Sequence, residues 1–260
     1  MQTSEVLNFT ARNAALGLNL PDVPITIDSP QEPIGCVVLF HGFGRKPDAL
    51  DELTTALIDA GMWVVRPYLK SRAKGGLNDR DLMRAVGDEV QGLKPADLPV
   101  VVMGHSAGGA VAMVVAKEMI ERAQPVVGVL LIDANGSIEN IMQPGFDALS
   151  ERGIPVRTVA ASAGRCNGKA ATARWLMEQS QPFAGIQLTT GRHCDVEGTK
   201  SDLTCRLLCG GVPDPTNAAI IRTLAVGWSR AWLTRKSEPE IEPGGKRLSI
   251  WEDLRVVKVL

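Results

Sequence analysis

The segment PVVVMGHSAG, residues 99–108, decides the fold of this chain. A near-continuous apolar run of this length is typical of a strand buried on both faces, and Gly108 to Arg122 has a helical pattern. Between them, Gly104-His105-Ser106-Ala107-Gly108 fits a G-x-S-x-G turn, in which the flanking glycines remove β-carbons that would collide. We therefore expect Ser106 at the carboxyl end of a buried strand, with its hydroxyl presented as a nucleophile.

Outward from this segment, short runs rich in Val, Ile and Leu alternate with longer helical patterns. The expected strands are CVVLF (36–40), WVVRPYL (63–69), PVVVMG (99–104), VVGVLLI (126–132), PVRTVAA (155–161) and GIQLTT (185–190). The expected helices cover 47–60, 79–91, 108–122, 168–178 and 216–234. This alternation predicts an α/β fold, with a mostly parallel sheet covered by helices on both faces. Two earlier segments, VLNFTAR (6–12) and ITIDS (25–29), are expected to add an antiparallel edge.

A length of 260 residues suits one α/β domain with a single sizeable core. The composition shifts after residue 235, where KSEPEIEPGGKR reads as an exposed, turn-rich connection. Beyond it, Ser249 and Glu252 fit a capping box at the start of a short helix. We expect residues 236–260 to be a linker and C-terminal extension that packs on the domain formed by residues 1–235.

The composition excludes several classes of protein. Apolar residues make up 45% of the chain and charged residues 22%, as in globular proteins. The net charge is −1 and the basic residues are scattered, so a nucleic-acid partner is not expected. The longest apolar runs are too short to span a bilayer. The N-terminal residues show no basic start followed by an apolar block, which makes a cytoplasmic protein the default expectation.

The five cysteines follow no spacing of a paired C-x-x-C zinc site, so no metal is predicted. Cys194, Cys205 and Cys209 cluster in sequence, and Cys166 is a candidate to join them in space. Reduced thiols and one loop-pinning disulfide are both compatible with this pattern, because the redox compartment decides between them.

The strand at 36–40 runs into His41-Gly42-Phe43-Gly44, and this motif followed by G-x-S-x-G resembles the α/β-hydrolase family. The resemblance covers nearly the whole chain and makes residues 1–235 the expected catalytic domain. In that family, the loop after this strand and the residue after the nucleophile each donate a backbone N–H to the oxyanion hole. By position, the resemblance assigns these two donors to Phe43 and Ala107.

His193 is the expected general base. Only three histidines occur, and His41 and His105 belong to the oxyanion loop and the serine turn. His193 follows the strand at 185–190, where this family carries its base. A serine nucleophile needs a neighbouring base to accept its proton, and this requirement favours a functional role over that of an ordinary surface histidine.

The expected acid is Asp133. Many members of the family place it after the strand that here reads PVRTVAA, but the following SAGRCNGKA contains no carboxylate. Asp133 ends the preceding strand, the position used by the branch that contains platelet-activating-factor acetylhydrolases and chlorophyllases. Asp195 and Glu197 compete for the role, but a residue so close to the base cannot easily turn back to orient the same imidazole. Asp195 is interpreted as a loop-stabilising acceptor instead.

These residues predict a serine esterase that needs no cofactor and acts on a small-molecule ester. Thioester, amide and polyester hydrolysis use the same three residue types, and a noncatalytic protein that retains the fold is the alternative from another class. Between Asp133 and Pro155 the chain has room for about one helix. A large lid is therefore not expected, and the site should be open.

Overall fold

The computed structural model describes residues 3–8, 23–69, 80–93, 97–179 and 181–260. Its centre is one nine-stranded sheet of order β1-β2-β4-β3-β5-β6-β7-β8-β9. The strands are β1 (Thr3–Asn8), β2 (Pro24–Ser29), β3 (Gly35–Phe40), β4 (Met62–Pro67), β5 (Val100–His105), β6 (Val126–Ile132), β7 (Val156–Ala160), β8 (Gly185–Leu188) and β9 (Val257–Val259). The six strands from β4 to β8 in this order run parallel, which brings all their carboxyl ends to one edge.

The outer strands join the sheet through antiparallel pairing. β2 pairs antiparallel with β4, and β1 with β2. The expected antiparallel edge is therefore present, although residues 9–12 of the segment VLNFTAR lie outside the described residues. At the other end of the sheet, β9 pairs antiparallel with β8, so the C-terminal segment contributes a strand to the same sheet.

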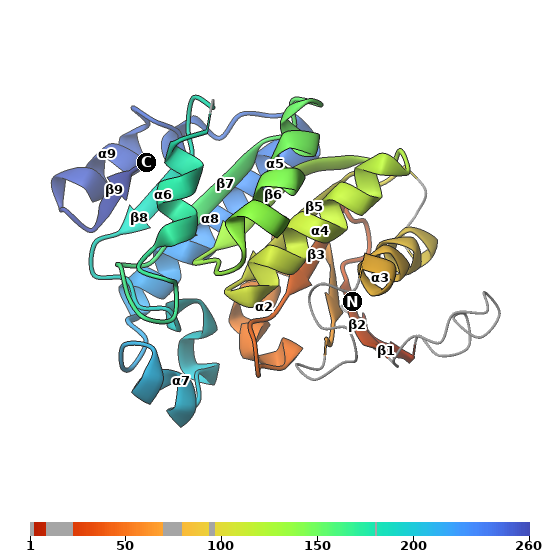
Figure 1. The fold of residues 1–260 in the computed structure, drawn as a ribbon, viewed down its shortest axis with the longest axis horizontal. Coiled ribbons are helices and arrows are strands. Elements are labelled where there is room, and N and C mark those ends of the chain that lie inside the picture. Colours follow the sequence, from red (N-terminus) through yellow and green to blue (C-terminus); the bar gives the residue numbers. More distant parts are fainter. Residues whose placement is uncertain (1–2, 9–22, 70–79, 94–96, 180) are drawn as a thin grey trace.

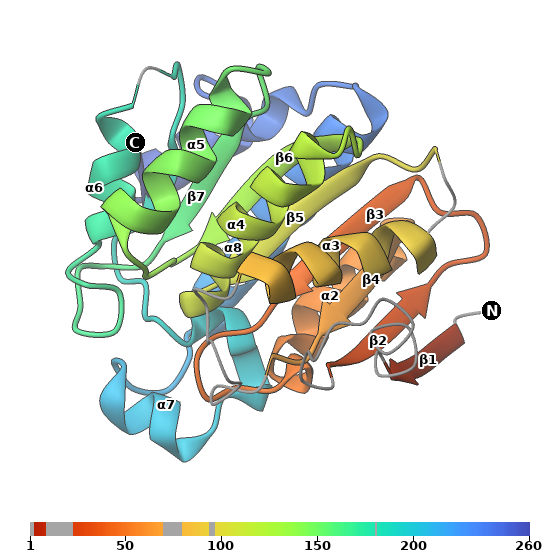
Figure 2. The same cartoon turned by 45° about the vertical axis from the view of Figure 1, so that its right-hand side comes forward.

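Helices cover both faces of the sheet, as the sequence predicts (Figure 1). One face carries α3 (Arg80–Leu93), α4 (Ala107–Glu121), α5 (Gln143–Ser150) and α6 (Ala171–Met177). The other carries α2 (Asp51–Asp59) and α8 (Pro215–Thr234), and the small helix α7 (Leu203–Leu208) stands out from the body (Figure 2). Shorter turns are η1 (Pro47–Leu50), η3 (Ile138–Met142), η4 (Asp195–Lys200) and η5 (Pro239–Ile241).

Two apolar layers, one on each side of the sheet, form the core. Alternate residues of the central strands point to opposite faces, so Val38 packs with α3 and α4 while Val37 packs with α2 and α8. Because both faces are covered, all six residues in each of β3, β4 and β5 are buried. This burial explains why these strands read as continuous apolar runs rather than as alternating ones.

The structure also corrects details of the expected boundaries. The strand expected at 63–69 ends at Pro67, and the helix expected from Gly168 begins at Ala171. The capping box was wrong: α9 (Lys246–Asp253) begins after Gly245, without a side-chain cap, and Ser249 lies inside it. Between β6 and β7 the chain forms only η3 and α5, so no large lid follows β6.

Candidate active site

Ser106 lies in a tight turn between β5 and α4, at the carboxyl edge of the sheet. Its φ of 55° and ψ of −126° lie outside the regions that residues with a side chain usually adopt. The close approach of strand and helix explains the two glycines of the motif. A Cβ on Gly104 would overlap the Gly108 carbonyl oxygen, and one on Gly108 would lie 2.5 Å from the carbonyl oxygens of Phe40 and His41.

Ser106, His193 and Asp133 form one hydrogen-bonded chain. The Ser106 Oγ lies 2.9 Å from His193 Nε2, and His193 Nδ1 lies 2.6 Å from Asp133 Oδ2. All three side chains are buried, although they come from positions 87 and 60 residues apart in the sequence. The structure thus brings together the three residues selected from the sequence. In this geometry the serine proton has an acceptor, and the proton on Nδ1 is directed at a carboxylate.

Asp133 is oriented by hydrogen bonds to the carboxylate oxygen that does not contact the imidazole. Its φ of 42° turns the chain sharply at the end of β6. Its second oxygen, Oδ1, accepts hydrogen bonds from the Ala161 backbone N–H at 2.8 Å and from Asn167 Nδ2 at 2.9 Å. Asn167 was missed by sequence reasoning, which searched residues 162–170 for a carboxylate. A search for a side-chain donor to Asp133 in that loop would have found this asparagine.

The two residues expected to form the oxyanion hole, Phe43 and Ala107, both have unpaired backbone N–H groups. Within the described residues, neither the Phe43 nor the Ala107 N–H has a hydrogen-bond acceptor. Ala107 is the first residue of α4, where N–H groups are unpaired and the helix dipole favours negative charge. The Phe43 loop lies close to the serine, because a Cβ on the preceding Gly42 would be 3.1 Å from the Ser106 Cβ.

The other two histidines are neutral groups that hold the surrounding loops. The Leu69 N–H donates to His41 Nε2 at 3.2 Å, which leaves Nδ1 as the donor to the Gly42 carbonyl at 2.8 Å. Burial lowers the pKa of His41. His105 Nε2 donates to the backbone carbonyl of His193 at 2.8 Å. Burial, followed by the proximity of His193, holds the pKa of His105 well below its ordinary value of 6.5.

Asp195 is turned away from the imidazole and stabilises its own loop. It accepts hydrogen bonds from the backbone N–H groups of Arg192 and Asp214, both at 2.8 Å, and from Asn217 Nδ2 at 2.9 Å. Burial raises its pKa, and these three donors oppose the shift. Asp195 therefore has the acceptor role that the sequence interpretation gave it.

Glu197 makes a buried ion pair that joins two loops of the site. Both of its oxygens accept from the Arg45 guanidinium, at 2.7 and 2.5 Å, and its side chain is 0% exposed. Burial raises the pKa of Glu197, and Arg45 opposes that shift. Since Arg45 follows Phe43-Gly44 and Glu197 follows His193, the pair ties the loop of Phe43 to the loop of the histidine.

Four of the five cysteines are paired in two disulfides beside the site. Cys194, next to His193, is bonded to Cys205 of α7, and Cys166, next to Asn167, is bonded to Cys209. Both bonds therefore end on α7 or at its C-cap. The sulfur atoms of Cys194, Cys205 and Cys209 lie within 4.8 Å of one another, a grouping that resembles a metal site, but each sulfur is already bonded.

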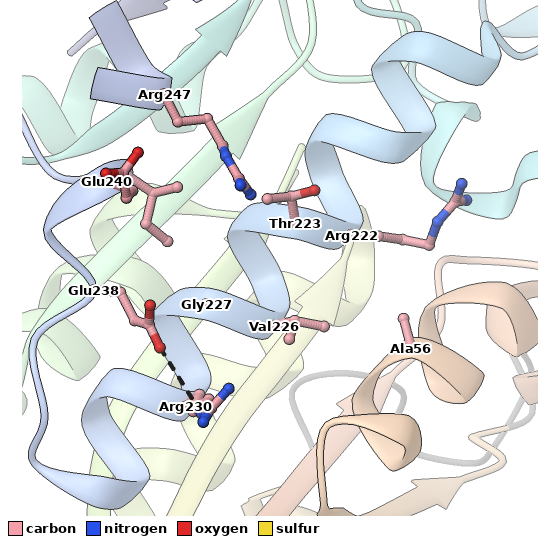
Figure 3. Close-up of a pocket in the computed structure, with 10 residues that line it drawn as sticks. Ala56, Arg222, Thr223, Val226, Gly227, Arg230, Glu238, Glu240 and Arg247 are labelled. Atoms are coloured by element: carbon pink, nitrogen blue, oxygen red, sulfur yellow. Dashed lines mark ion pairs between the residues drawn. The ribbon is translucent and has the colours of Figure 1, made fainter. Parts of the chain in front are cut away.

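A separate cavity of about 430 Å³ lies along α8, between it and the segment of η5 and α9 (Figure 3). Thr223, Gly227 and Arg247 contribute to its lining, together with Arg230, which pairs with Glu238 at 3.8 Å. None of the candidate site residues lines this cavity.

Comparisons with known proteins agree with this fold. Residues 37–244 match the sequence profile of the Alpha/beta hydrolase family. A solved structure described as the esterase domain of a Rhodothermus marinus protein superimposes with a TM-score of 0.62 at 17% identity, covering 89% of this chain and 100% of that chain. A lipase in its open form matches with a TM-score of 0.42 at 21% identity, over 50% of this chain and 44% of that chain. A search of curated protein sequences finds no match.

Within the described ranges, no helix has the length and apolar character needed to cross a bilayer.

Proposed function

Because this chain belongs to the alpha/beta hydrolase family, we propose that it hydrolyses a carboxylic ester through a covalent acyl-enzyme. Ser106 is the nucleophile, His193 the general base and Asp133 the acid that orients it. The observation that carries the proposal is the hydrogen-bonded chain from Ser106 Oγ through His193 to Asp133, at 2.9 and 2.6 Å. The esterase description of the superimposed Rhodothermus marinus domain adds support for ester chemistry.

In the first step, His193 Nε2 takes the hydroxyl proton while Ser106 Oγ forms a bond to the ester carbonyl carbon. Asp133 accepts the hydrogen bond from Nδ1, which fixes the tautomer and stabilises the imidazolium that forms. The unpaired Phe43 and Ala107 N–H groups are suited to hold the negative oxygen of the tetrahedral intermediate. His193 then gives its proton to the alcohol as the carbon–oxygen bond breaks.

In the second step, His193 takes a proton from water, and the hydroxide attacks the acyl carbon bound to Ser106. The serine leaves with the proton from His193, and a carboxylic acid is released. All the atoms of the released alcohol and carboxylic acid come from the ester and one water molecule.

The position of Asp133 after β6 also supports a place in the branch that contains platelet-activating-factor acetylhydrolases and chlorophyllases.

The Ser106→Ala variant tests this proposal. It should show no hydrolysis of p-nitrophenyl acetate or butyrate above background, with an unchanged circular dichroism spectrum. A fluorophosphonate probe should label the folded wild-type protein at Ser106 and leave the variant unlabelled. Full activity in Ser106→Ala, or a wild-type protein that neither hydrolyses nor reacts, would contradict the assignment.

A matched set of substrates separates the acyl classes. An ester, a thioester and an amide with the same butyryl group should be hydrolysed with the ester at the highest kcat/KM. A higher value for the thioester or the amide would move the function to that class. The same three residues would then serve a different leaving group.

We also propose that the protein works in an oxidising compartment. Two disulfides beside the site support this location, since such bonds persist in secreted and periplasmic proteins and are rare in the cytosol. This proposal replaces the cytoplasmic default suggested by the N-terminal residues. Counting free thiols in denatured protein isolated from its native source tests it: one thiol per chain is expected, and five would contradict it.

A further inference from the structure

Exposed apolar side chains gather beside the candidate active site. Leu203, Leu207 and Leu208 of α7 are 69%, 74% and 62% exposed, and Val212, just beyond the helix, is 60% exposed. We call these four residues the α7 patch. Phe43, in the oxyanion loop, is 72% exposed. Five of the eight large apolar side chains that are exposed in the described part of the chain thus belong to this region, a concentration that marks an interaction surface.

The α7 patch is held outward by covalent and ionic links. Cys205 and Cys209 tie the helix to the body through the two disulfides. At the other end of the helix, Asp202 caps the first turn by accepting from the Cys205 N–H at 2.8 Å, and it is paired with Arg45. Only Cys205 of the helix is buried. Because these links fasten the inner side of α7 to the body, its leucines stay exposed.

These links also place the α7 patch at the rim of the site. Cys205 is bonded to the residue after His193, and Asp202 contacts Arg45, two residues after Phe43. In Figures 1 and 2, α7 projects from the body beyond the carboxyl edge of the sheet, where Ser106 lies. A surface touched by the α7 patch would therefore face the nucleophile.

Unpaired positive charge surrounds the α7 patch. Arg206 lies within the helix, Arg165 precedes the disulfide-bonded Cys166, and Arg192 donates to the Val212 carbonyl. Within the described residues, none of these three arginines forms an ion pair. Two carboxylates lie at this rim: Asp202 is paired with Arg45, and Asp214 caps α8 by accepting from the Thr216 N–H at 2.8 Å. A chain with a net charge of −1 thus has a basic rim around its most exposed leucines.

We propose that the α7 patch docks the protein on anionic phospholipid bilayers, so that an ester held in the lipid layer reaches Ser106. The substrate part rests on the proposed function. Apolar side chains at such an interface enter the boundary of the acyl chains while basic side chains remain among the phosphates. A second copy of this chain is the less suitable occupant, because a symmetric contact through the α7 patch would bring two basic rims together.

Sedimentation with vesicles tests the docking surface directly. The full-length protein, with its disulfides intact, should bind vesicles of phosphatidylglycerol and phosphatidylcholine and bind pure phosphatidylcholine at least about tenfold more weakly. Added salt should weaken the binding, because it screens the arginines. Equal binding to both vesicle types, or binding to neither, would overturn the proposal.

Matched variants localise the contact. Leu207→Ser should weaken vesicle binding at least about tenfold. Leu254→Ser, at a leucine of similar exposure (67% against 74%) after α9, should change it less than about twofold. Arg165→Gln should weaken binding about fivefold, with Arg247→Gln as the neutral control. Equal losses for Leu207→Ser and Leu254→Ser would overturn the assignment to the α7 patch.

Two further readouts separate this proposal from the proposed function. Leu207→Ser should hydrolyse soluble p-nitrophenyl acetate at the wild-type rate but lose at least about tenfold in rate on an ester embedded in the anionic vesicles. Ser106→Ala should bind the vesicles like the wild type and hydrolyse nothing. Vesicle binding without any hydrolysis would contradict the function alone. Soluble activity without vesicle binding, or a dimer in the ultracentrifuge that Leu207→Ser dissociates, would overturn the docking proposal alone.

Discussion

The two halves of the candidate site are positioned in different ways. On the nucleophile side, the backbone conformation positions the side chain. Ser106 has a positive φ between a fully buried strand and a helix, and two glycines allow the strand and the helix to approach closely. On the acid–base side, contacts between side chains position the residues. His193 and Asp133 lie in connections held by hydrogen bonds, a buried ion pair and two disulfides.

This difference means that the two halves should respond differently to mutation. The tightly packed turn at Ser106 is destabilised when a side chain is added, because no space exists for it. Loops held by cross-links fail when a link is removed, because the chain between the links is then released.

Asp133→Asn should lower kcat on p-nitrophenyl butyrate about ten-thousandfold, because an asparagine no longer fixes the productive tautomer of His193 or balances the imidazolium charge. Asp195→Asn is the matched control and should cost less than about tenfold, since Asp195 contacts its own loop. A near-normal rate for Asp133→Asn together with a large loss for Asp195→Asn would transfer the acid role to Asp195.

Removing the outer disulfide with Cys166→Ser and Cys209→Ser should lower the free energy of unfolding by about 4 kcal/mol, given the 43-residue separation of the two cysteines. It should also lower kcat, because Asn167 follows Cys166 and holds Asp133. Urea denaturation and kinetics on the same samples measure both effects. Lower stability with an unchanged kcat would show that this link does not position the acid.

Gly108→Ala should lower the free energy of unfolding by about 3 kcal/mol, because the new Cβ would lie 2.5 Å from two carbonyl oxygens. Gly164→Ala is the control on the acid side. Its nearest neighbours would be 3.7 and 3.9 Å away, so its effect should stay within about 0.5 kcal/mol. Similar stabilities for the two variants would mean that the turn at Ser106 is not tightly packed.

The free energy of unfolding should fall as the pH falls through 6.5, the ordinary pKa of histidine. Burial lowers the pKa of His105 in the folded state, so the unfolded chain binds the proton first and gains stability relative to the folded protein. The stability from this one group is lost progressively below pH 6.5, until the pH reaches the lowered pKa of the folded state. Urea titrations of the wild type and His105→Gln should show a shallower pH dependence in the variant; identical slopes would contradict this role.

The same contrast explains what could be predicted from the sequence. The parallel sheet and the position of Ser106 follow from local patterns, namely apolar runs, glycine spacing and a helical segment. The buried layers are consistent with those runs. His193 was selected from only three histidines, and Asp133 from its place at the end of a strand.

The links that hold the acid–base side could not be predicted, because they join residues far apart in the chain. Asn167 contacts Asp133 across 34 residues, and Arg45 contacts Glu197 across 152. A polar residue in a loop carries no local mark of such a partner. The cysteine cluster was visible, but its pairing depends on three-dimensional distances that spacing does not give.

The closeness of the cysteine sulfur atoms has a chemical consequence. Because the Sγ atoms of Cys194, Cys205 and Cys209 lie within 4.8 Å, a thiolate released from one bond has a sulfur of the other bond within reach. Thiol–disulfide exchange proceeds by such an attack, through a mixed pairing of the sulfur atoms. Replacing Cys166 alone would therefore leave the Cys209 thiolate beside the intact Cys194–Cys205 bond and allow the partners to exchange. The two disulfides form one exchange-coupled unit, in which the cysteines must be removed in pairs.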